Sequence, residues 1–388
     1  MFRRLPHTLP PDAVYEPDLA KLGFFINGED QIRSVQNPER KYQYRVNRNE
    51  RWNEVHKCTG DLTAALLIAA FLAAIRKIVT DRLADLGCDT VRLPLGAGES
   101  ENHVPILVSK EIATKSRVTV FFGARNTEPG ILSWRIIGHQ GIKHGSLVEF
   151  AKALLSVPVL ETASPTSTST SKSASASVPG LIVANPCQLL WYRGGGRAVS
   201  AYEWLCLPRP SAVHEAPRVD SVKNKIPGNG TYGEHVSYMF EKVIPSFVDK
   251  EAKLDLIALE YSGSAMLEYL AEHWDSWSGR INGISLITPQ YKAEDLISDG
   301  APSGFMNFIS KRCRAYFVSE SPIETPIAGR ERFGCNCYAS GEQVYQENVI
   351  VKCWRHILDW FNMLYINQDY EEVEFEVFKE DEEVKLGW

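Results

Sequence analysis

The segment Asp255-Leu-Ile-Ala-Leu-Glu-Tyr-Ser-Gly-Ser-Ala265 constrains the fold of this chain more than any other. Residues 256–259 are apolar and predict a buried strand, and residues 266–274 predict a helix. Only a sharp turn fits between the two. A buried strand that passes directly into a helix is typical of a parallel sheet covered by helices.

Such a strand–turn–helix unit is the frame of the nucleophile elbow, in which α/β-hydrolases place a serine in the pattern G-x-S-x-G. If Ser262 is the nucleophile, the two glycine positions fall on Glu260 and Ser264. Small residues are needed there because the turn crowds the strand against the helix, and Glu260 is large and charged. The sequence therefore predicts a degenerate elbow that keeps the architecture and lacks the chemistry.

The rest of the chain alternates short apolar strands with helical segments over 388 residues. This alternation predicts an α/β fold, with a mostly parallel sheet and helices on both faces. We expect one domain over residues 1–388, with an N-terminal extension at 1–60 that contains a hairpin around Asn27-Gly28. Residues 162–177 are almost wholly Ser, Thr, Ala, Pro and Lys and predict a disordered insertion. Residues 369–388 form an acidic tail, solvated or paired as an edge strand.

Composition excludes several classes of function. The net charge of −6 without a basic stripe argues against direct binding of nucleic acid. The longest apolar run, residues 62–75, is too short to span a bilayer and predicts a buried helix that Gly87 ends. No signal peptide is visible, and we expect no membrane association.

No cofactor or metal is expected. The 8 cysteines are scattered, and Cys335 and Cys337 are too close for a redox pair and have no second pair at zinc spacing. Residues 194–196 are three glycines, but the Lys-Ser/Thr of a phosphate-binding loop is missing.

The catalytic triad is also incomplete. Glu320 follows a predicted strand and is a possible acid, but the loop after the last strand, residues 340–346, contains no histidine. His356 lies inside the predicted helix 349–364, which presents it poorly to the loop end of the sheet. We therefore expect no enzymatic activity. Two alternatives stay open: a serine hydrolase with Ser262 as nucleophile, and a ligand-binding pseudo-hydrolase.

Several stretches, in this order and spacing, resemble the argonaute-binding-protein-two domain family. They cover most of the chain and are residues 15–27, 32–34, 47–51, 92–96, 115–123, 210–214 and 226–229. The resemblance implies an α/β-hydrolase-like fold to which catalysis is generally not assigned. It also implies a subunit of an argonaute siRNA chaperone complex, which acts in RNA interference, gene silencing and heterochromatin formation. The implied partners are argonaute, a second chaperone-complex subunit and chromatin silencing factors, in the nucleus and cytoplasm.

The predicted binding surfaces are the long irregular stretch 191–232 and the exposed ends of the sheet. The aromatic residues of this stretch are candidate anchors for a partner, or else they pack in the core. They are Trp191, Tyr192, Trp204 and Tyr232.

Overall fold

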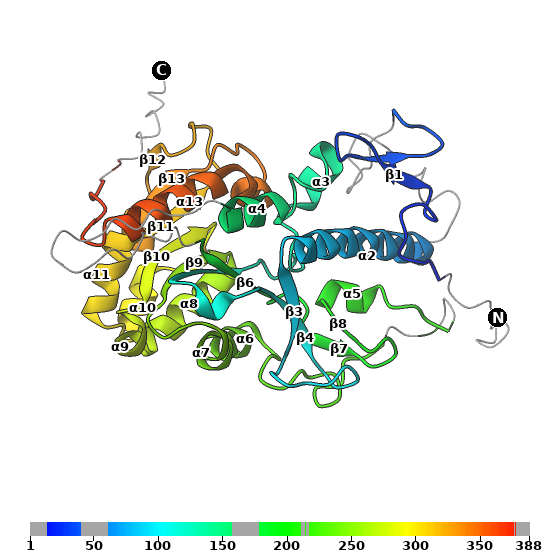
Figure 1. Ribbon diagram of the computed structural model, residues 1–388, viewed down its shortest axis with the longest axis horizontal. Helices are drawn as coiled ribbons and strands as arrows, with labels where there is room; N and C mark the ends of the chain where they lie inside the picture. The colour runs from blue at the N-terminus through cyan, green and yellow to red at the C-terminus, as the bar shows by residue number, and fades with distance from the viewer. Residues whose placement is uncertain are drawn as a thin grey trace, which may run out of the picture.

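A computed structural model describes residues 14–39, 61–156, 178–210, 214, 217–375 and 377. Its centre is a nine-stranded sheet, ordered β3–β4–β6–β5–β9–β10–β11–β13–β12 (Figure 1). The strands are β3 (Cys88–Leu93), β4 (Val104–Ser109), β5 (Arg117–Phe122), β6 (Gly180–Ala184), β9 (Lys253–Leu259), β10 (Ile281–Ile287), β11 (Cys313–Phe317), β12 (Pro326–Ile327) and β13 (Asn336–Ala339).

The middle of the sheet is parallel from β6 to β13. At one edge β4 runs antiparallel to both β3 and β6, and at the other β12 runs antiparallel to β13. The strand β9, which leads into the predicted elbow, lies at the centre with parallel neighbours on both sides. The predicted fold class, an α/β-hydrolase-like mostly parallel sheet, is confirmed.

Helices cover both faces of the sheet, because alternate side chains of each buried strand point to opposite sides. In β9, Ile257 and Leu259 join one hydrophobic cluster and Leu256 and Ala258 join the other. The first cluster includes α2 (Asp61–Asp85), α3 (Trp134–Gln140), α4 (Val148–Ser156) and α13 (Val349–Ile366). The second includes α6 (Tyr232–Tyr238), the π-helical turn Met239–Val243, α7 (Ile244–Phe247), α8 (Tyr261–Glu272), α9 (Trp274–Trp277), α10 (Ala293–Ser298), α11 (Ser303–Arg312) and α12 (Arg330–Phe333).

Two small hairpins flank the sheet. The strands β1 (Phe24–Ile26) and β2 (Ile32–Ser34) pair antiparallel, which confirms the predicted N-terminal hairpin. The strands β7 (Leu190–Tyr192) and β8 (Arg197–Val199) pair in the stretch expected to be irregular, and α5 (Ala201–Leu205) follows them. An ion-pair network fastens this unit to the body, since Arg76 on α2 contacts Glu128 and Glu203, and Glu203 also contacts Arg197.

The acidic C-terminal segment is described over residues 369–375 and 377. The side chain of Glu372 is only 2% exposed and fixes the segment to the body at this point, whereas residues 369, 371, 373–375 and 377 are exposed. No strand forms within this described part. The predicted insertion at 162–177 lies outside the described residues, as does much of the extension at 1–60. None of the helices in the described ranges has the length and apolar content to cross a membrane.

Candidate functional site

The strand-to-helix turn after β9 is a true elbow, but its tip is Glu260. Glu260 has φ 50° and ψ −123°, and α8 starts at the next residue. Non-glycine residues rarely adopt this backbone conformation, and it costs about 1–3 kcal/mol where the surrounding structure enforces it. The small residues that the turn requires are Ala258 and Ser262, two positions before and after the tip.

This register corrects the placement of Ser262 at the nucleophile position. Ser262 is 1% exposed, and its hydroxyl donates a 2.7 Å hydrogen bond to the carbonyl of Gly123 at the end of β5. Ser264 lies further into α8 and donates to the carbonyl of Gln290. Both hydroxyls therefore hold the elbow against neighbouring loops, and the turn presents a carboxylate in place of a hydroxyl.

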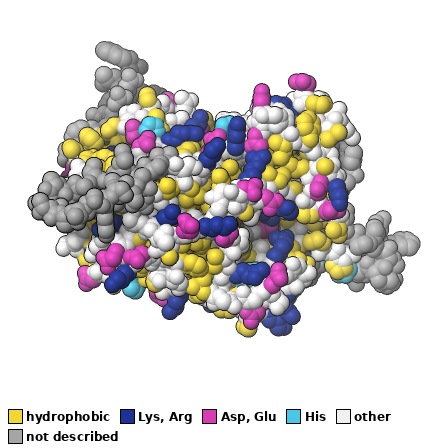
Figure 2. All heavy atoms as spheres, in the orientation of Figure 1, with side chains coloured by type: hydrophobic (Ala, Val, Ile, Leu, Met, Phe, Trp, Pro, Cys, Tyr) yellow, Lys and Arg dark blue, Asp and Glu magenta, His cyan; other side chains and the backbone are white. Residues whose placement is uncertain are grey.

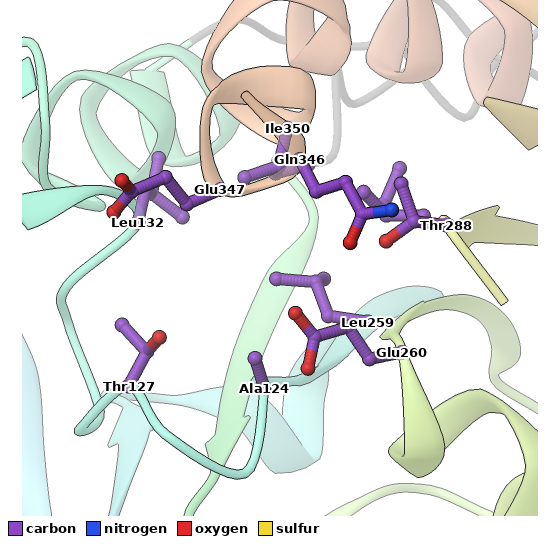
Figure 3. Close-up of a pocket in the computed structure, with 10 residues that line it drawn as sticks. Ala124, Thr127, Leu132, Leu259, Glu260, Thr288, Gln346, Glu347 and Ile350 are labelled. Carbon is purple, nitrogen blue, oxygen red and sulfur yellow. The ribbon is translucent and has the colours of Figure 1, made fainter. Parts of the chain in front are cut away.

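A small pocket opens beside the tip, which we call the elbow pocket (Figure 3). Its cavity volume is about 20 Å³, which is room for one or two water molecules. The carboxylate of Glu260 points into it. Residues from the ends of β5, β9 and β10 and from the start of α13 line it, namely Ala124, Thr127, Leu132, Leu259, Glu260, Ile287, Thr288, Gln346, Glu347 and Ile350.

A second strained residue lies in the elbow pocket. Thr288 follows β10 directly, as Glu260 follows β9, and has φ 45°. Threonine is β-branched, so a positive φ at this position is a marked outlier. Glu260 and Thr288 stand at the carboxyl ends of adjacent parallel strands, which is where open α/β sheets bind ligands.

Electrostatics distinguish the two carboxylates of the elbow pocket. Glu347 accepts a 3.0 Å hydrogen bond from Arg135. Burial raises the pKa of the Glu260 carboxyl, and the positive charge of Arg125 opposes this rise. The Arg125 guanidinium packs over the rings of Tyr261 and Tyr232, 5.4 and 5.8 Å from their centroids, and forms no ion pair with the described carboxylates.

The remaining triad positions do not assemble around Glu260. Glu320 is exposed on the loop after β11, and no histidine lines the elbow pocket within the described ranges. His356 pairs with Glu324 at 3.2 Å, but it lies six residues, about 9 Å, further along α13 than Ile350. In the loop after β13, Glu342 is buried and accepts hydrogen bonds from the backbone amides of Val344 and Tyr345.

The strain at the elbow leads to a prediction about stability. Glu260→Gly is expected to raise the free energy of unfolding by about 1 kcal/mol, because the relief of strain exceeds the extra freedom of glycine in the unfolded chain. Glu268→Gly, within the same helix α8, is the control and is expected to lower it by about 1 kcal/mol. Urea unfolding measures both. Equal destabilisation by the two substitutions would contradict strain at Glu260.

The aromatic anchors predicted for a partner are mostly internal. Trp191 is 3% exposed and Trp204 is 6% exposed, and the Trp204 indole donates to the carbonyl of Pro217 at 2.7 Å. Tyr192 is half-buried against Trp204, and Tyr232 is half-buried beside Arg125. For Trp191 and Trp204 the alternative interpretation, core packing, is therefore correct.

The described ranges contain no group of three or more His, Cys, Asp or Glu side chains placed to hold a metal ion. Sequence reasoning overlooked Glu260 as the tip, although Ala258 and Ser262 supply the small-x-Glu-x-small pattern. It also overlooked Thr288 and Gln346, since no motif marks them and only the fold brings them together.

Comparisons with known proteins point to one family. The model of the Arb2 domain matches residues 15–323. Among solved structures, a histone deacetylase from Saccharomyces cerevisiae is similar at 14% identity and a TM-score of 0.38, over 74% of this chain and 95% of that one. The histone deacetylase Clr3 is similar at 11% identity and a TM-score of 0.40, over 84% of this chain and 41% of that one. None of the curated proteins compared with the chain matches it.

Proposed function

The chain belongs to the Arb2 domain family, argonaute-binding protein 2, and on this premise we propose that it is a non-catalytic interaction subunit that binds argonaute. The observation that carries the proposal is the glutamate at the tip of the elbow. The fold keeps the position of the hydrolase nucleophile. Glutamate occupies it in place of serine, so acyl transfer to a serine hydroxyl cannot take place there. We extend the proposal to a chaperone complex with a second subunit, acting with chromatin silencing factors in the nucleus and cytoplasm.

The residues of the elbow pocket argue against catalytic turnover of a substrate. A carboxylate can act as a nucleophile, but release of the resulting ester requires a base that activates water. Histidine most often has that role, and none lines the elbow pocket within the described residues. A cavity of about 20 Å³ is also far below the several hundred Å³ of ordinary substrate sites.

The surface above the elbow pocket has the composition of a protein-binding site. Tyr261, Val344 and Tyr345, which we call the rim, are 46%, 65% and 42% exposed. Tyr261 and Tyr345 are next in sequence to Glu260 and Gln346, which line the elbow pocket, and Val344 precedes Tyr345. The guanidinium of Arg135 lies 3.6 Å from the centroid of the Tyr345 ring, which orders this side chain. Tyrosine and arginine are enriched among the residues that dominate protein–protein affinity.

The charge pattern favours a protein partner over nucleic acid. On the face shown in Figure 2, lysine and arginine side chains are interspersed with aspartate and glutamate. A phosphate backbone would require a continuous basic track.

Co-purification tests the proposal. The tagged chain is expected to recover argonaute from cells that express both proteins. The double variant Tyr261→Ala/Tyr345→Ala is expected to recover at least tenfold less, since truncation of central aromatic anchors commonly costs 2 kcal/mol or more. Tyr202→Ala is the control, because Tyr202 is 55% exposed on α5 and is not a member of the rim. Failure of the unaltered chain to recover argonaute contradicts the proposal, and equal recovery by the rim variant contradicts the placement of the surface.

The second candidate, a serine hydrolase that uses Ser262, has a direct test. A fluorophosphonate probe is expected to leave the folded chain unlabelled, because the Ser262 hydroxyl is buried and bound to Gly123. Labelling that disappears in Ser262→Ala would establish the hydrolase instead.

A further inference from the structure

The carboxylate of Glu260 has no partner of its own. Among the described residues, none donates a hydrogen bond to it and none forms an ion pair with it, although its backbone amide donates to the carbonyl of Ile287 at 2.9 Å. The positive charge of Arg125 acts on this carboxylate, but its guanidinium packs over the rings of Tyr232 and Tyr261. The side chain is partly buried, and burial without a partner disfavours the charged form of a carboxyl group.

The backbone aims this carboxylate into the elbow pocket at a cost in stability. Glu260 and Thr288 both hold positive φ angles, and both line the same cavity. Residues in such conformations cluster at ligand clamps and active sites. A strained turn thus places an unpaired carboxylate in a cavity. This arrangement suits the binding of a cation.

The shape of the elbow pocket selects the kind of cation. A volume of about 20 Å³ suits the compact charge of an ammonium group better than a planar guanidinium with its five donors. An ammonium group donates three hydrogen bonds. The polar side chains of Thr127, Thr288 and Gln346 surround the cavity together with the Glu260 carboxylate (Figure 3). Leu259, Ile287 and Ile350 supply an apolar wall for the alkyl chain.

We propose that the elbow pocket binds the ammonium group of a lysine side chain that a partner protein inserts beside Glu260. The exposed rim residues Tyr261 and Tyr345, each next in sequence to a residue that lines the elbow pocket, would pack against the backbone that carries the lysine. This inference rests on the proposed role as an interaction subunit and adds the chemistry of the contact. It does not depend on argonaute being that partner.

Methyl NMR on the full chain, with labelled isoleucine methyl groups, tests the site without any partner protein. The probe is Nα-acetyl-lysine N-methylamide, and its Nε-acetylated form is the uncharged control. The methyl signals of Ile287 and Ile350, which line the elbow pocket, are expected to shift with the first probe and not with the second. The signal of Ile106, buried in β4 outside the elbow pocket, is expected to stay in place.

Substitution then assigns the charge. Glu260→Gln is expected to weaken binding of the lysine probe at least tenfold, and Glu320→Gln, which changes an exposed carboxylate after β11, is expected to leave it unchanged. Equal shifts with the charged and uncharged probes, or none with either, overturn the proposal without any variant. Propylammonium is expected to shift the same signals, because it carries the same ammonium group on an alkyl chain. Loss of argonaute binding would not affect these readouts, so the two proposals can fail separately.

Discussion

Replacement of Glu372 by alanine is expected to lower the free energy of unfolding by about 3 kcal/mol, because it removes the closest counter-charge of a largely buried arginine and leaves only Glu324, 3.9 Å away. The Glu372 carboxylate accepts hydrogen bonds from Nε of Arg314 at 2.7 Å, from the indole of Trp360 at 2.9 Å and from the hydroxyl of Tyr338 at 2.8 Å. Arg314 in β11 is 13% exposed and also packs over the rings of Tyr338 and Trp360. One carboxylate therefore joins the C-terminal segment to two strands and to α13.

The neighbouring residue provides the control. Glu371→Ala removes the same side chain from an exposed position, where the carboxylate lies 3.7 Å from the ammonium group of Lys311. Its expected cost is below about 1 kcal/mol, as for other surface ion pairs. Denaturant unfolding of both variants measures the difference. Similar losses in the two, or a loss below 1 kcal/mol for Glu372→Ala, would show that the segment is not anchored through this carboxylate.

Glu372 also shows a limit of sequence reasoning. In the run Asp369-Tyr-Glu-Glu-Val-Glu-Phe-Glu376, acidic side chains alternate with apolar ones, and nothing local separates Glu372 from Glu371 or Glu374. The distinction arises from Arg314, which lies far away in the sequence on a buried strand. A pattern of charge predicts a solvated segment, whereas burial of one member depends on a partner that only the fold supplies.

The strands of the parallel sheet were predictable because both of their faces are buried. Such strands are continuous apolar runs, as β5 and β6 show at residues 118–122 and 180–184. The hairpin β7–β8 was not predicted, since each strand has only three residues and the glycines between them predict a loop.

The strand–turn–helix elbow was predicted correctly, but the residue at its tip was not. A serine in a strand–turn–helix unit suggests the hydrolase pattern, and this placed Ser262 at the tip. The backbone angles place Glu260 there instead, with Ala258 and Ser262 in the crowded positions. The bulk of Glu260 was taken as a reason for degeneracy. At the tip a large side chain meets no crowding, so size never excluded it, and the argument against catalysis now concerns its chemistry.

A buried histidine is expected to make the fold sensitive to acid. His235 in α6 has no exposed surface, and burial lowers its pKa to about 3. Its Nε2 accepts a 3.0 Å hydrogen bond from the backbone amide of Asn185, and its Nδ1 lies 2.7 Å from the side-chain oxygen of Asn229. These contacts require a neutral ring that carries its proton on Nδ1. Protonation of Nε2 would set a donor against the Asn185 amide in a fully buried site.

The sign of the pH dependence follows from the lowered pKa. The ordinary pKa of histidine is 6.5, so this residue binds a proton below pH 6.5 in the unfolded chain. In the folded chain it binds the proton only near pH 3. The stabilising effect of the neutral ring is thus complete above pH 6.5 and is lost as the pH falls toward 3. Between pH 7 and pH 4 this single residue is expected to remove about 3 kcal/mol from the free energy of unfolding.

Other carboxyl groups also titrate in this range, so the measurement is a difference between proteins. His235→Gln is expected to be less stable at pH 7, because glutamine cannot satisfy both Asn185 and Asn229 in the same geometry. Its free energy of unfolding is nevertheless expected to fall about 3 kcal/mol less than that of the unaltered chain between pH 7 and pH 4. His273→Gln, at the exposed end of α8, controls for the loss of a histidine as such. Parallel pH profiles for His235→Gln and the unaltered chain would mean that His235 titrates alike in both states, and that the Asn185–His235–Asn229 contacts do not hold the ring neutral.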